Sequence, residues 1–237
     1  TGGSRGIGRA TALAAAARGY RIVVGYATNQ AAADEVVSAI EAKNGKAIAV
    51  KCDVGSEADI LALFKAADGF GTLGALVNNA GTAVFAPVLE TADADWSRIM
   101  AVNLTGPFLC TKAAAPLMRE HGGGAIVNTA SIAGLVGLAT SAHYVATKHG
   151  VVGLTKSAAI EYAQDGIRVN CVNPGYIKTP MTRETMDERY DEIIAKVPVR
   201  RLGVPEEIAE AVVWMCSDKA SFMTGASHVI DGGYSAA

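Results

Sequence analysis

A tyrosine and a lysine in the second half of the chain are spaced so that both can act on one bound molecule. Tyr144 and Lys148 are four residues apart in a stretch with helical patterning, which places their side chains on one helix face. We expect the Lys148 ammonium to lower the pKa of the Tyr144 phenol, so that the phenol exchanges protons near neutral pH. This spacing alone more often marks an exposed helix face. Ser131, thirteen residues before Tyr144, follows the apolar run 125–128 and thus lies where parallel sheets bind ligands, which favours acid–base chemistry.

The chain begins with a glycine-rich turn that is followed by the alanine-rich stretch 9–18. Its residues are Thr1-Gly2-Gly3-Ser4-Arg5-Gly6-Ile7-Gly8. Glycines let the backbone turn tightly and approach a pyrophosphate, and the N-terminus of the next helix offers N–H groups to an anion. A plain structural turn is the alternative, but the strands and helices that surround this turn favour dinucleotide binding.

The segment at the end of the next apolar run favours NADP(H) over NAD. Its sequence, Val24-Gly25-Tyr26-Ala27-Thr28-Asn29, holds no carboxylate for a ribose 2′-hydroxyl. Arg5 lies in the glycine turn within reach of a 2′-phosphate, and an exposed surface residue is the alternative. A guanidinium binds a phosphate and a carboxylate repels it, so Arg5 and Tyr26 are the positions expected to decide the cofactor.

Apolar β-branched runs alternate with longer amphipathic stretches almost throughout the chain. We expect strands at 22–24, 47–50, 73–77, 125–127, 167–172 and 228–230, and helices at 30–43, 56–67, 95–120, 142–164 and 205–217. This alternation predicts a single α/β domain over residues 1–237, with a doubly wound, Rossmann-like parallel sheet that helices cover on both faces.

The strand before the glycine turn and the segment 176–199 do not follow the regular alternation of strands and helices. A doubly wound sheet has a central strand directly before its glycine turn, so we expect the first strand upstream of residue 1. Residues 176–199 interrupt the alternation with apolar side chains among many charges, including Met181, Met186 and Tyr190. We expect this segment to be a lid over the substrate, and an ordinary surface helix is the alternative.

These motifs together resemble the single-domain branch of the short-chain dehydrogenase/reductase family. The matching pieces occur in order along the whole chain: TGGSRGIG, Asp53-Val54, Asn78-Asn79-Ala80-Gly81, Asn103, Ser131, Tyr144 with Lys148, and Pro174-Gly175 followed by Ile177 and Thr179. Gly74 stands where an Asp is common in the family, which removes one local hydrogen bond. Ala130 stands where a second Ser is usual.

The resemblance implies a role for each matching residue. Tyr144 would be the general acid/base, Ser131 would orient the substrate oxygen, and Lys148 would hold the nicotinamide ribose and assist Tyr144. Asn103 would hold a water in a proton relay. In the implied cofactor site, Asp53 and Val54 would flank the adenine, and Ile177 and Thr179 would flank the carboxamide. The whole implied cofactor site consists of Gly2, Ser4, Arg5, Gly6, Ile7, Gly8, Tyr26, Asp53, Val54, Asn79, Ala80, Gly81, Tyr144, Lys148, Pro174, Gly175, Ile177 and Thr179. The resemblance also implies a homotetramer, with the long helices at one interface and 225–237 at another.

Composition excludes several other classes of protein. Hydrophobic residues make up 50% of the 237 residues and charged residues 19%, which excludes disorder. The net charge of −2 argues against nucleic acid as a partner, and no apolar run is long enough to span a membrane. The four cysteines are far apart, which indicates buried reduced thiols, no metal site and a cytoplasmic protein.

Charge near the expected site favours a small free substrate over one carried on a protein. Reductases of 3-oxoacyl-[acyl-carrier-protein] need basic residues for their acidic partner, expected just before the strand at 125–128 and just before Gly166. Those places hold Gly122-Gly123-Gly124 and Asp165, although Arg119 and Lys112 lie nearby. We therefore expect a small carbonyl or secondary alcohol, with the carrier-protein substrate as the alternative. A non-catalytic NADP-binding protein is the alternative of another class, and Tyr144, Lys148 and Ser131 argue against it.

Overall fold

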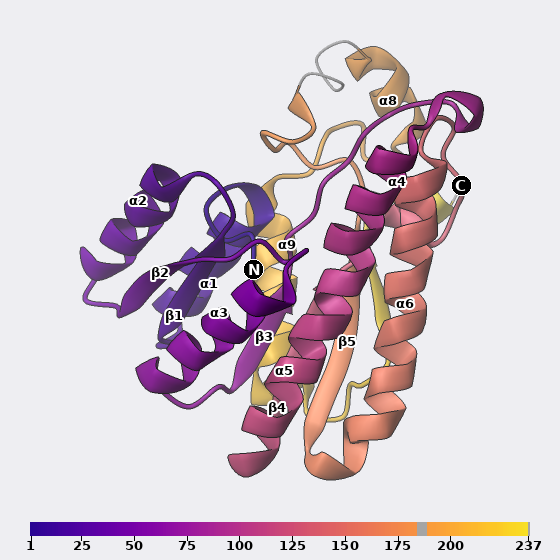
Figure 1. The fold of residues 1–237 in the computed structure, drawn as a ribbon. Coiled ribbons are helices and arrows are strands. Elements are labelled where there is room, and N and C mark those ends of the chain that lie inside the picture. Colours follow the sequence, from indigo (N-terminus) through magenta and orange to yellow (C-terminus); the bar gives the residue numbers. More distant parts are fainter. Residues whose placement is uncertain (184–188, 237) are drawn as a thin grey trace.

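The computed structural model describes residues 1–183 and 189–236, and its helices and strands alternate along the chain (Figure 1). The strands are β1 Ile22–Tyr26, β2 Ala47–Lys51, β3 Ala75–Asn78, β4 Gly124–Thr129, β5 Ile167–Pro174 and β6 Ser227–Ile230. The helices are α1 Gly6–Ala17, α2 Gln30–Glu41, α3 Glu57–Phe70, α4 Asp93–Met100, α5 Gly106–Glu120, α6 Ala142–Tyr162, α8 Tyr190–Lys196 and α9 Pro205–Cys216.

The predicted elements are confirmed, with one predicted helix divided. The helix expected at 95–120 consists of α4 and α5, joined by a π-helical turn at Ala101–Thr105. Local sequence explains where other helices begin. Asn29 accepts a hydrogen bond from Ala32 N at 2.9 Å and so caps α2, and the Ser56 side chain caps α3 in the same way.

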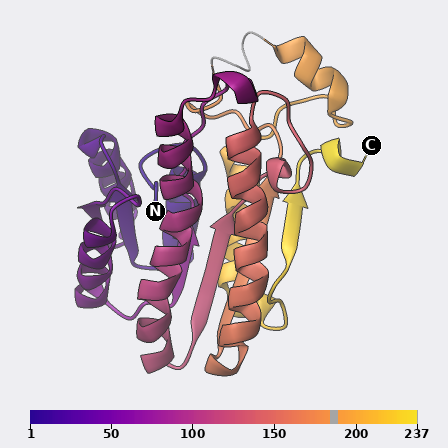
Figure 2. The same cartoon turned by 45° about the vertical axis from the view of Figure 1, so that its right-hand side comes forward.

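All strand pairs are parallel, and helices cover both faces of the strands (Figures 1 and 2). Helix α9 packs along α1 on one face, while α3, α5 and α6 lie on the other. Strand β5 is buried for nearly its whole length, and its buried Asn170 and Asn173 side chains donate hydrogen bonds to Met223 O and to the Ser227 hydroxyl. The predicted α/β fold with a parallel, doubly wound arrangement is therefore confirmed.

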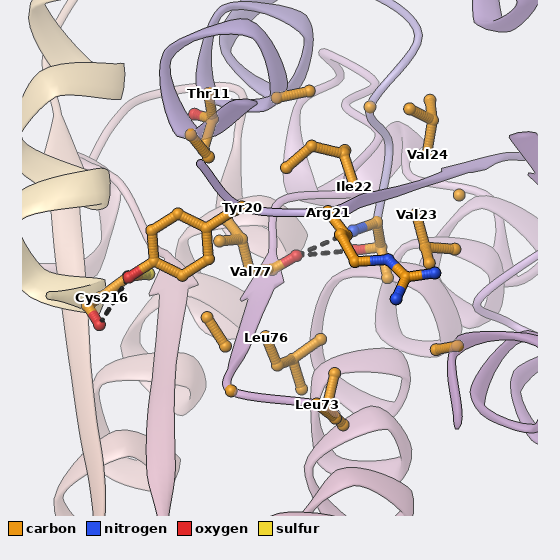
Figure 3. A pocket seen from close by; sticks show the side chains of 18 of the residues that line it. Thr11, Tyr20, Arg21, Ile22, Val23, Val24, Leu73, Leu76, Val77 and Cys216 are labelled. Carbon is orange, nitrogen blue, oxygen red and sulfur yellow. Dashed lines mark hydrogen bonds between the residues drawn. The ribbon is translucent and has the colours of Figure 1, made fainter. Parts of the chain in front are cut away.

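The strands form two separate groups, with an apolar slot between them. Strand β1 pairs with β2, and β3, β4, β5 and β6 pair in that order. The slot has a volume of about 580 Å³ and lies between β1 and β3, with α1 and α9 on one side and α3 on the other (Figure 3). At its end, Thr1 N donates to Val77 O at 2.8 Å and Gly3 N donates to Gly25 O at 2.9 Å.

The facing edges of β1 and β3 border the slot. Both strands that border it offer backbone groups without a strand partner on that side, and its lining is mostly apolar, including Val23, Val24 and Leu76 (Figure 3). The expected central strand upstream of residue 1 stays a prediction.

The cysteines agree with the expectation of buried thiols. All four are free, and Cys52, Cys110 and Cys171 are buried. Burial raises the pKa of Cys110 to about 12, so this thiol stays protonated and unreactive at neutral pH. Among the described residues, no helix is long and apolar enough to cross a membrane.

Candidate active site

A cavity of about 380 Å³ opens where the carboxyl ends of the strands meet the glycine turn. All of the predicted site residues line it except Gly8 and Asn103. The lining residues that were predicted are Gly2, Ser4, Arg5, Gly6, Ile7, Tyr26, Asp53, Val54, Asn79, Ala80, Gly81, Ser131, Tyr144, Lys148, Pro174, Gly175, Ile177 and Thr179. Six parts of the sequence that are far apart in the chain thus meet at one site.

The glycine turn has the close backbone contacts that its sequence predicts. Gly2 and Gly6 have positive φ angles of 63° and 54°, a conformation that other residues rarely adopt. Gly8 lies under the turn, where an added Cβ atom would be 2.2 Å from Gly2 O and 2.5 Å from Asn79 Nδ2. Because α1 begins at Gly6, its free N–H groups and positive dipole end face the cavity, which suits a pyrophosphate.

The segment after β3 braces this turn. The Thr1 hydroxyl accepts hydrogen bonds from Asn79 N at 3.2 Å and from Ala80 N at 3.1 Å. The Asn79 side chain donates to Gly2 O at 3.1 Å. Asn79 therefore holds the turn in place, whereas the side chain of Asn78 is directed into the protein interior, where it contacts Asn128.

Tyr144, Ser131 and Lys148 form the reactive end of the cavity. Tyr144 and Ser131 share a side-chain hydrogen bond, and the Ser131 hydroxyl also accepts from Ala133 N at 3.1 Å. Lys148 is buried, and its Nζ atom donates to Thr129 O at 2.8 Å while lying 5.4 Å from the centre of the Tyr144 ring. Strand β4 and helix α6 thus position all three side chains.

The protonation of Tyr144 differs from the sequence-based expectation. Burial raises the pKa of Tyr144 above its ordinary value of 10.0, and the hydrogen bond with Ser131 opposes this rise only in part. Burial also lowers the pKa of Lys148 to about 8. The expected lowering of the Tyr144 pKa by Lys148 is not seen; the opposing effect comes from Ser131, and burial outweighs it. Tyr144 is therefore a phenol that can donate a proton at neutral pH.

Asn103 lies in the π-helical turn and does not line the cavity. Its side chain donates to Thr82 O at 2.8 Å and accepts from Thr82 N at 2.9 Å, so it fixes the loop after Gly81. A Cβ atom on Gly81 would be 3.5 Å from Asn103 Oδ1 and 4.0 Å from Lys148 Nζ, which places Asn103 close to the lysine. The π-helical turn explains how an asparagine fits inside a helix, and such turns often mark functional sites. The water-holding role of Asn103 stays a prediction.

Several lining residues were not found from the sequence, Arg98 above all. Arg98 donates to Asp53 Oδ2 at 2.9 Å and holds the pKa of that carboxyl below its ordinary value. The pair joins residues 45 positions apart, so no local pattern could have indicated it. Asp53 is the one acid among the described lining residues, and it is already paired.

Two observations show that the cavity fits a nucleotide cofactor. The glycine turn borders the cavity with residues that have no side chain, Gly2 and Gly6, both at positive φ. The buried Thr129 hydroxyl lines the cavity and has no hydrogen-bond partner among the described residues, so a polar ligand group could satisfy it. Near the glycine turn, Arg5 makes no ion pair within the described part of the chain, and Tyr26, Thr28 and Asn29 lie beside it.

The expected lid is described in part. Ile177, Thr179 and Met181 line the cavity, whereas Met186 lies outside the described residues. In α8, Ile193 is buried and packs with Val197 in a small cluster whose other members are Tyr176, Leu202 and Tyr234. The segment therefore has one part at the cavity and one part docked on the C-terminal residues.

A glycine cradle at a helix N-terminus, beside a tyrosine, a serine and a lysine, defines a nicotinamide-dependent oxidoreductase. The model of a family described as enoyl-(acyl carrier protein) reductase matches residues 2–235. Cyclohexanol dehydrogenase of Acinetobacter sp. (strain SE19) is 45% identical over 238 aligned residues, which cover 99% of this chain and 92% of the relative. A 3-oxoacyl-[acyl-carrier-protein] reductase of Synechocystis sp. is 43% identical over 235 residues, 98% of this chain and 94% of the relative.

Solved structures agree with these relatives. A structure from Beutenbergia cavernae, assigned as an NAD(P)-dependent gluconate 5-dehydrogenase with bound NADP at low occupancy, superimposes with a TM-score of 0.95. It is 34% identical to this chain and the match covers 100% of this chain and 95% of that one. The chain belongs to the short-chain dehydrogenase/reductase family and is an oxidoreductase. The alternative of a non-catalytic protein is not supported, since the relatives are dehydrogenases and reductases.

Proposed function

We propose that this protein is an NADP(H)-dependent oxidoreductase of a small, free carbonyl or secondary alcohol, with Tyr144 as general acid/base. The observation that carries the proposal is the position of Tyr144, Ser131 and Lys148 in the same cavity as the glycine turn. A bound nicotinamide cofactor supplies or accepts the hydride.

The reactive side chains have separate tasks in this proposal. Tyr144, protonated at neutral pH because burial raises its pKa, donates its hydroxyl proton to the substrate carbonyl oxygen during reduction. Ser131 holds the same oxygen by a hydrogen bond and so aligns it with Tyr144. Lys148 holds the nicotinamide ribose and keeps a positive charge beside the phenolate that remains. In the oxidation of an alcohol the proton moves in the opposite direction.

The preference for NADP(H) is supported by charge at the turn. Arg5 offers a guanidinium without a protein partner in the described residues, and no unpaired carboxylate lines that end of the cavity. The structure from Beutenbergia cavernae contains NADP at low occupancy. Gly2, Ser4, Gly6, Ile7 and Gly8 would hold the pyrophosphate in this site.

We expect Tyr26→Asp to shift cofactor preference toward NAD. A carboxylate at this position would repel the 2′-phosphate, which we expect to cost about 1–3 kcal/mol of NADPH binding. The measurement is the ratio of kcat/KM with NADPH to kcat/KM with NADH. Tyr26→Asn is the matched control, because it removes the same buried ring without adding charge, and its ratio should stay near that of the parent. A parent ratio below one would contradict the NADP(H) assignment.

Charge on the surface supports a free substrate. The two basic residues near the places expected to meet an acidic carrier protein are both paired with acids: Arg119 with Asp165 at 2.6 Å and Lys112 with Glu57 at 3.4 Å. The similarity to cyclohexanol dehydrogenase supports a small cyclic alcohol or ketone, whereas the similarity to the Synechocystis protein keeps 3-oxoacyl-[acyl-carrier-protein] reduction as the second candidate.

A substrate comparison tests the proposal. The purified protein would be assayed with cyclohexanol, cyclohexanone and other small ketones, and with a 3-oxoacyl thioester on acyl carrier protein, using NADP(H) and NAD(H). We expect higher kcat/KM for the free substrates. Faster turnover of the carrier-bound thioester would establish the second candidate instead.

We also propose that residues 176–199 form a lid over the substrate. Met181 reaches the cavity while Ile193 anchors the far part of the segment on the C-terminal residues, which suits a hinged element. Closure would exclude water from the reaction.

Hydrogen exchange should detect this lid. We expect the amides of 177–183 and 189–196 to exchange more slowly once NADPH and a substrate analogue are bound, because closure buries their hydrogen bonds. The amides of α2, far from the substrate end, serve as the internal control. Strong protection of the segment in the free protein, unchanged by ligand, would identify it as a rigid surface element.

Two further expectations from the family belong to this proposal. Large apolar side chains are exposed on α5, α6 and β6, including Phe108, Ile160 and Val229, and their positions support a homotetramer that buries them. Light scattering on the purified protein would measure the molar mass of the assembly and so the number of subunits. Four free cysteines support a reducing, cytoplasmic setting.

A further inference from the structure

A row of polar side chains crosses the interior beneath the active site. Asn78 on β3, Asn128 on β4, Cys171 on β5 and Ser227 on β6 occupy one level of the sheet, since each is the register partner of the next. Asn78 and Asn128 are only 3% and 1% exposed. Burying an amide among apolar side chains is costly unless its hydrogen bonds are made, so these residues must be held by specific partners.

Asn128 is the residue that joins this row to helix α6. Its side-chain oxygen accepts from Asn78 Nδ2 at 2.9 Å, and its side-chain nitrogen donates to the Thr155 hydroxyl at 2.9 Å. Thr155 is fully buried in α6, and its hydroxyl donates in turn to Val151 O at 2.8 Å. Asn128 thereby connects β3, β4 and α6.

The next residue of β4 makes a second connection to the same helix. The carbonyl of Thr129 accepts from Lys148 Nζ at 2.8 Å. Lys148 and Thr155 are seven residues apart, about two helical turns, so they lie on one face of α6. Within the described residues, these are the two side-chain hydrogen bonds that join α6 to β4.

The two connections are not equivalent. The bond from Lys148 belongs to a side chain that the proposed reaction uses, and a lysine side chain is long and flexible. The bond from Asn128 to Thr155 joins two short, buried side chains and can fix the distance between strand and helix. The titratable groups that face Lys148 are Tyr144 on its own helix and Cys171 on β5, and Asn103 lies across Gly81 from it.

We propose that Asn128 is a positioning residue for Lys148, which acts by holding α6 against β4 through Thr155. Asn128 thereby sets the distance between β4 and α6. This distance keeps Lys148 Nζ at hydrogen-bonding range of the Thr129 carbonyl and keeps Tyr144 aligned with Ser131. This inference rests on the proposed function, because it assigns Asn128 to the alignment of that active site.

Thr155→Val is the decisive variant, and Thr155→Ser is its matched control. Valine has the shape of threonine but removes the acceptor for Asn128, whereas serine keeps the hydroxyl. For alcohol oxidation with NADP, we expect Thr155→Val to lower kcat at least about tenfold, the typical scale of a misaligned catalytic group. We expect the apparent pKa of its kcat/KM profile to move by about half a unit or more, because a shift of α6 changes the burial that sets the pKa of Tyr144 and of Lys148. Thr155→Ser should stay within about threefold of the parent in kcat and keep its pH profile.

Two more variants separate positioning from stability. The double variant Asn128→Leu/Thr155→Val removes both partners of the bond and leaves no unpaired group between them, so it is the form to use if the single variant does not fold. We expect it to show the same shift of the pH profile. Thr111→Val removes a hydroxyl that accepts a hydrogen bond from Asn78 Nδ2 at 3.5 Å, on the side of Asn78 away from α6. The Thr111→Val variant should unfold at a lower urea concentration than the parent, but its kcat and its pH profile should match those of the parent.

The outcomes are distinct. A folded Thr155→Val or double variant with the kcat and pH profile of the parent would overturn the positioning role and leave Asn128 as a structural residue. An equal shift of the profile in Thr111→Val would also overturn it, because any loss of stability would then have the same effect. A parent protein that turns over no alcohol or ketone would overturn the proposed function, and this inference with it.

Discussion

Replacing Tyr144 by Phe should abolish turnover while leaving the fold and NADPH binding nearly intact. We expect kcat to fall by about 10²–10⁴-fold, the contribution typical of a positioned general acid. The ring remains in place, and Ser131 keeps its hydrogen bond from Ala133 N, so little packing is lost. The measurement is steady-state kinetics with the best substrate, together with NADPH binding by fluorescence.

Tyr162→Phe is the control for this variant. Tyr162 ends the same helix and is remote from the cavity, so loss of its hydroxyl should leave kcat unchanged. Activity of the Tyr144→Phe enzyme within a few-fold of the parent would show that another group transfers the proton.

The second large effect is expected from Gly8→Ala. The new Cβ atom would be 2.2 Å from Gly2 O, a backbone atom that cannot move without opening the cradle. We expect this overpacking to cost about 1–3 kcal/mol, which corresponds to NADPH binding weaker by up to about 100-fold. Titration of NADPH into the protein, followed by fluorescence, gives the change in Kd.

Gly69→Ala tests whether a methyl group on any helical glycine would do the same. Gly69 is exposed in α3, and nothing lies within 4 Å of its added Cβ atom. Its NADPH affinity should match the parent, and alanine should raise the free energy of unfolding by about 0.5–1 kcal/mol. An unchanged Kd in Gly8→Ala would mean that the turn does not hold the cofactor.

Local patterns were sufficient for the elements, whereas most of the cavity lining was inferred from the family resemblance. Periodicity predicts the strands because each buries an apolar run, and the carboxyl edge of a parallel sheet gathers the residues that follow those strands. Ser131 and Tyr144 therefore meet as expected. The glycine turn, Ser131 and Tyr144 follow from residues close in sequence and one rule of sheet geometry, and the other lining residues follow from the resemblance to the family.

Contacts between distant residues could not be read in this way. The pairing of Arg98 with Asp53 and the bond from Asn128 to Thr155 depend on how helices pack against strands. The protonation of Tyr144 depends on its burial, which raises its pKa and outweighs the hydrogen bond with Ser131. The π-helical turn at Asn103 replaces a helix that periodicity predicts as continuous.

The division of the sheet at the slot also bears on how the chain folds and unfolds. In the part of the chain that the structure describes, no strand-to-strand hydrogen bonds connect β1 with β3. Strands β1 and β2 share a hydrophobic cluster with α1 and α2, formed by residues that lie close together in sequence, such as Val24, Val36 and Ile40. Local contacts of this kind form quickly, so β1, α2 and β2 should fold early as one unit, which α1 then joins to the rest of the domain by packing on α9.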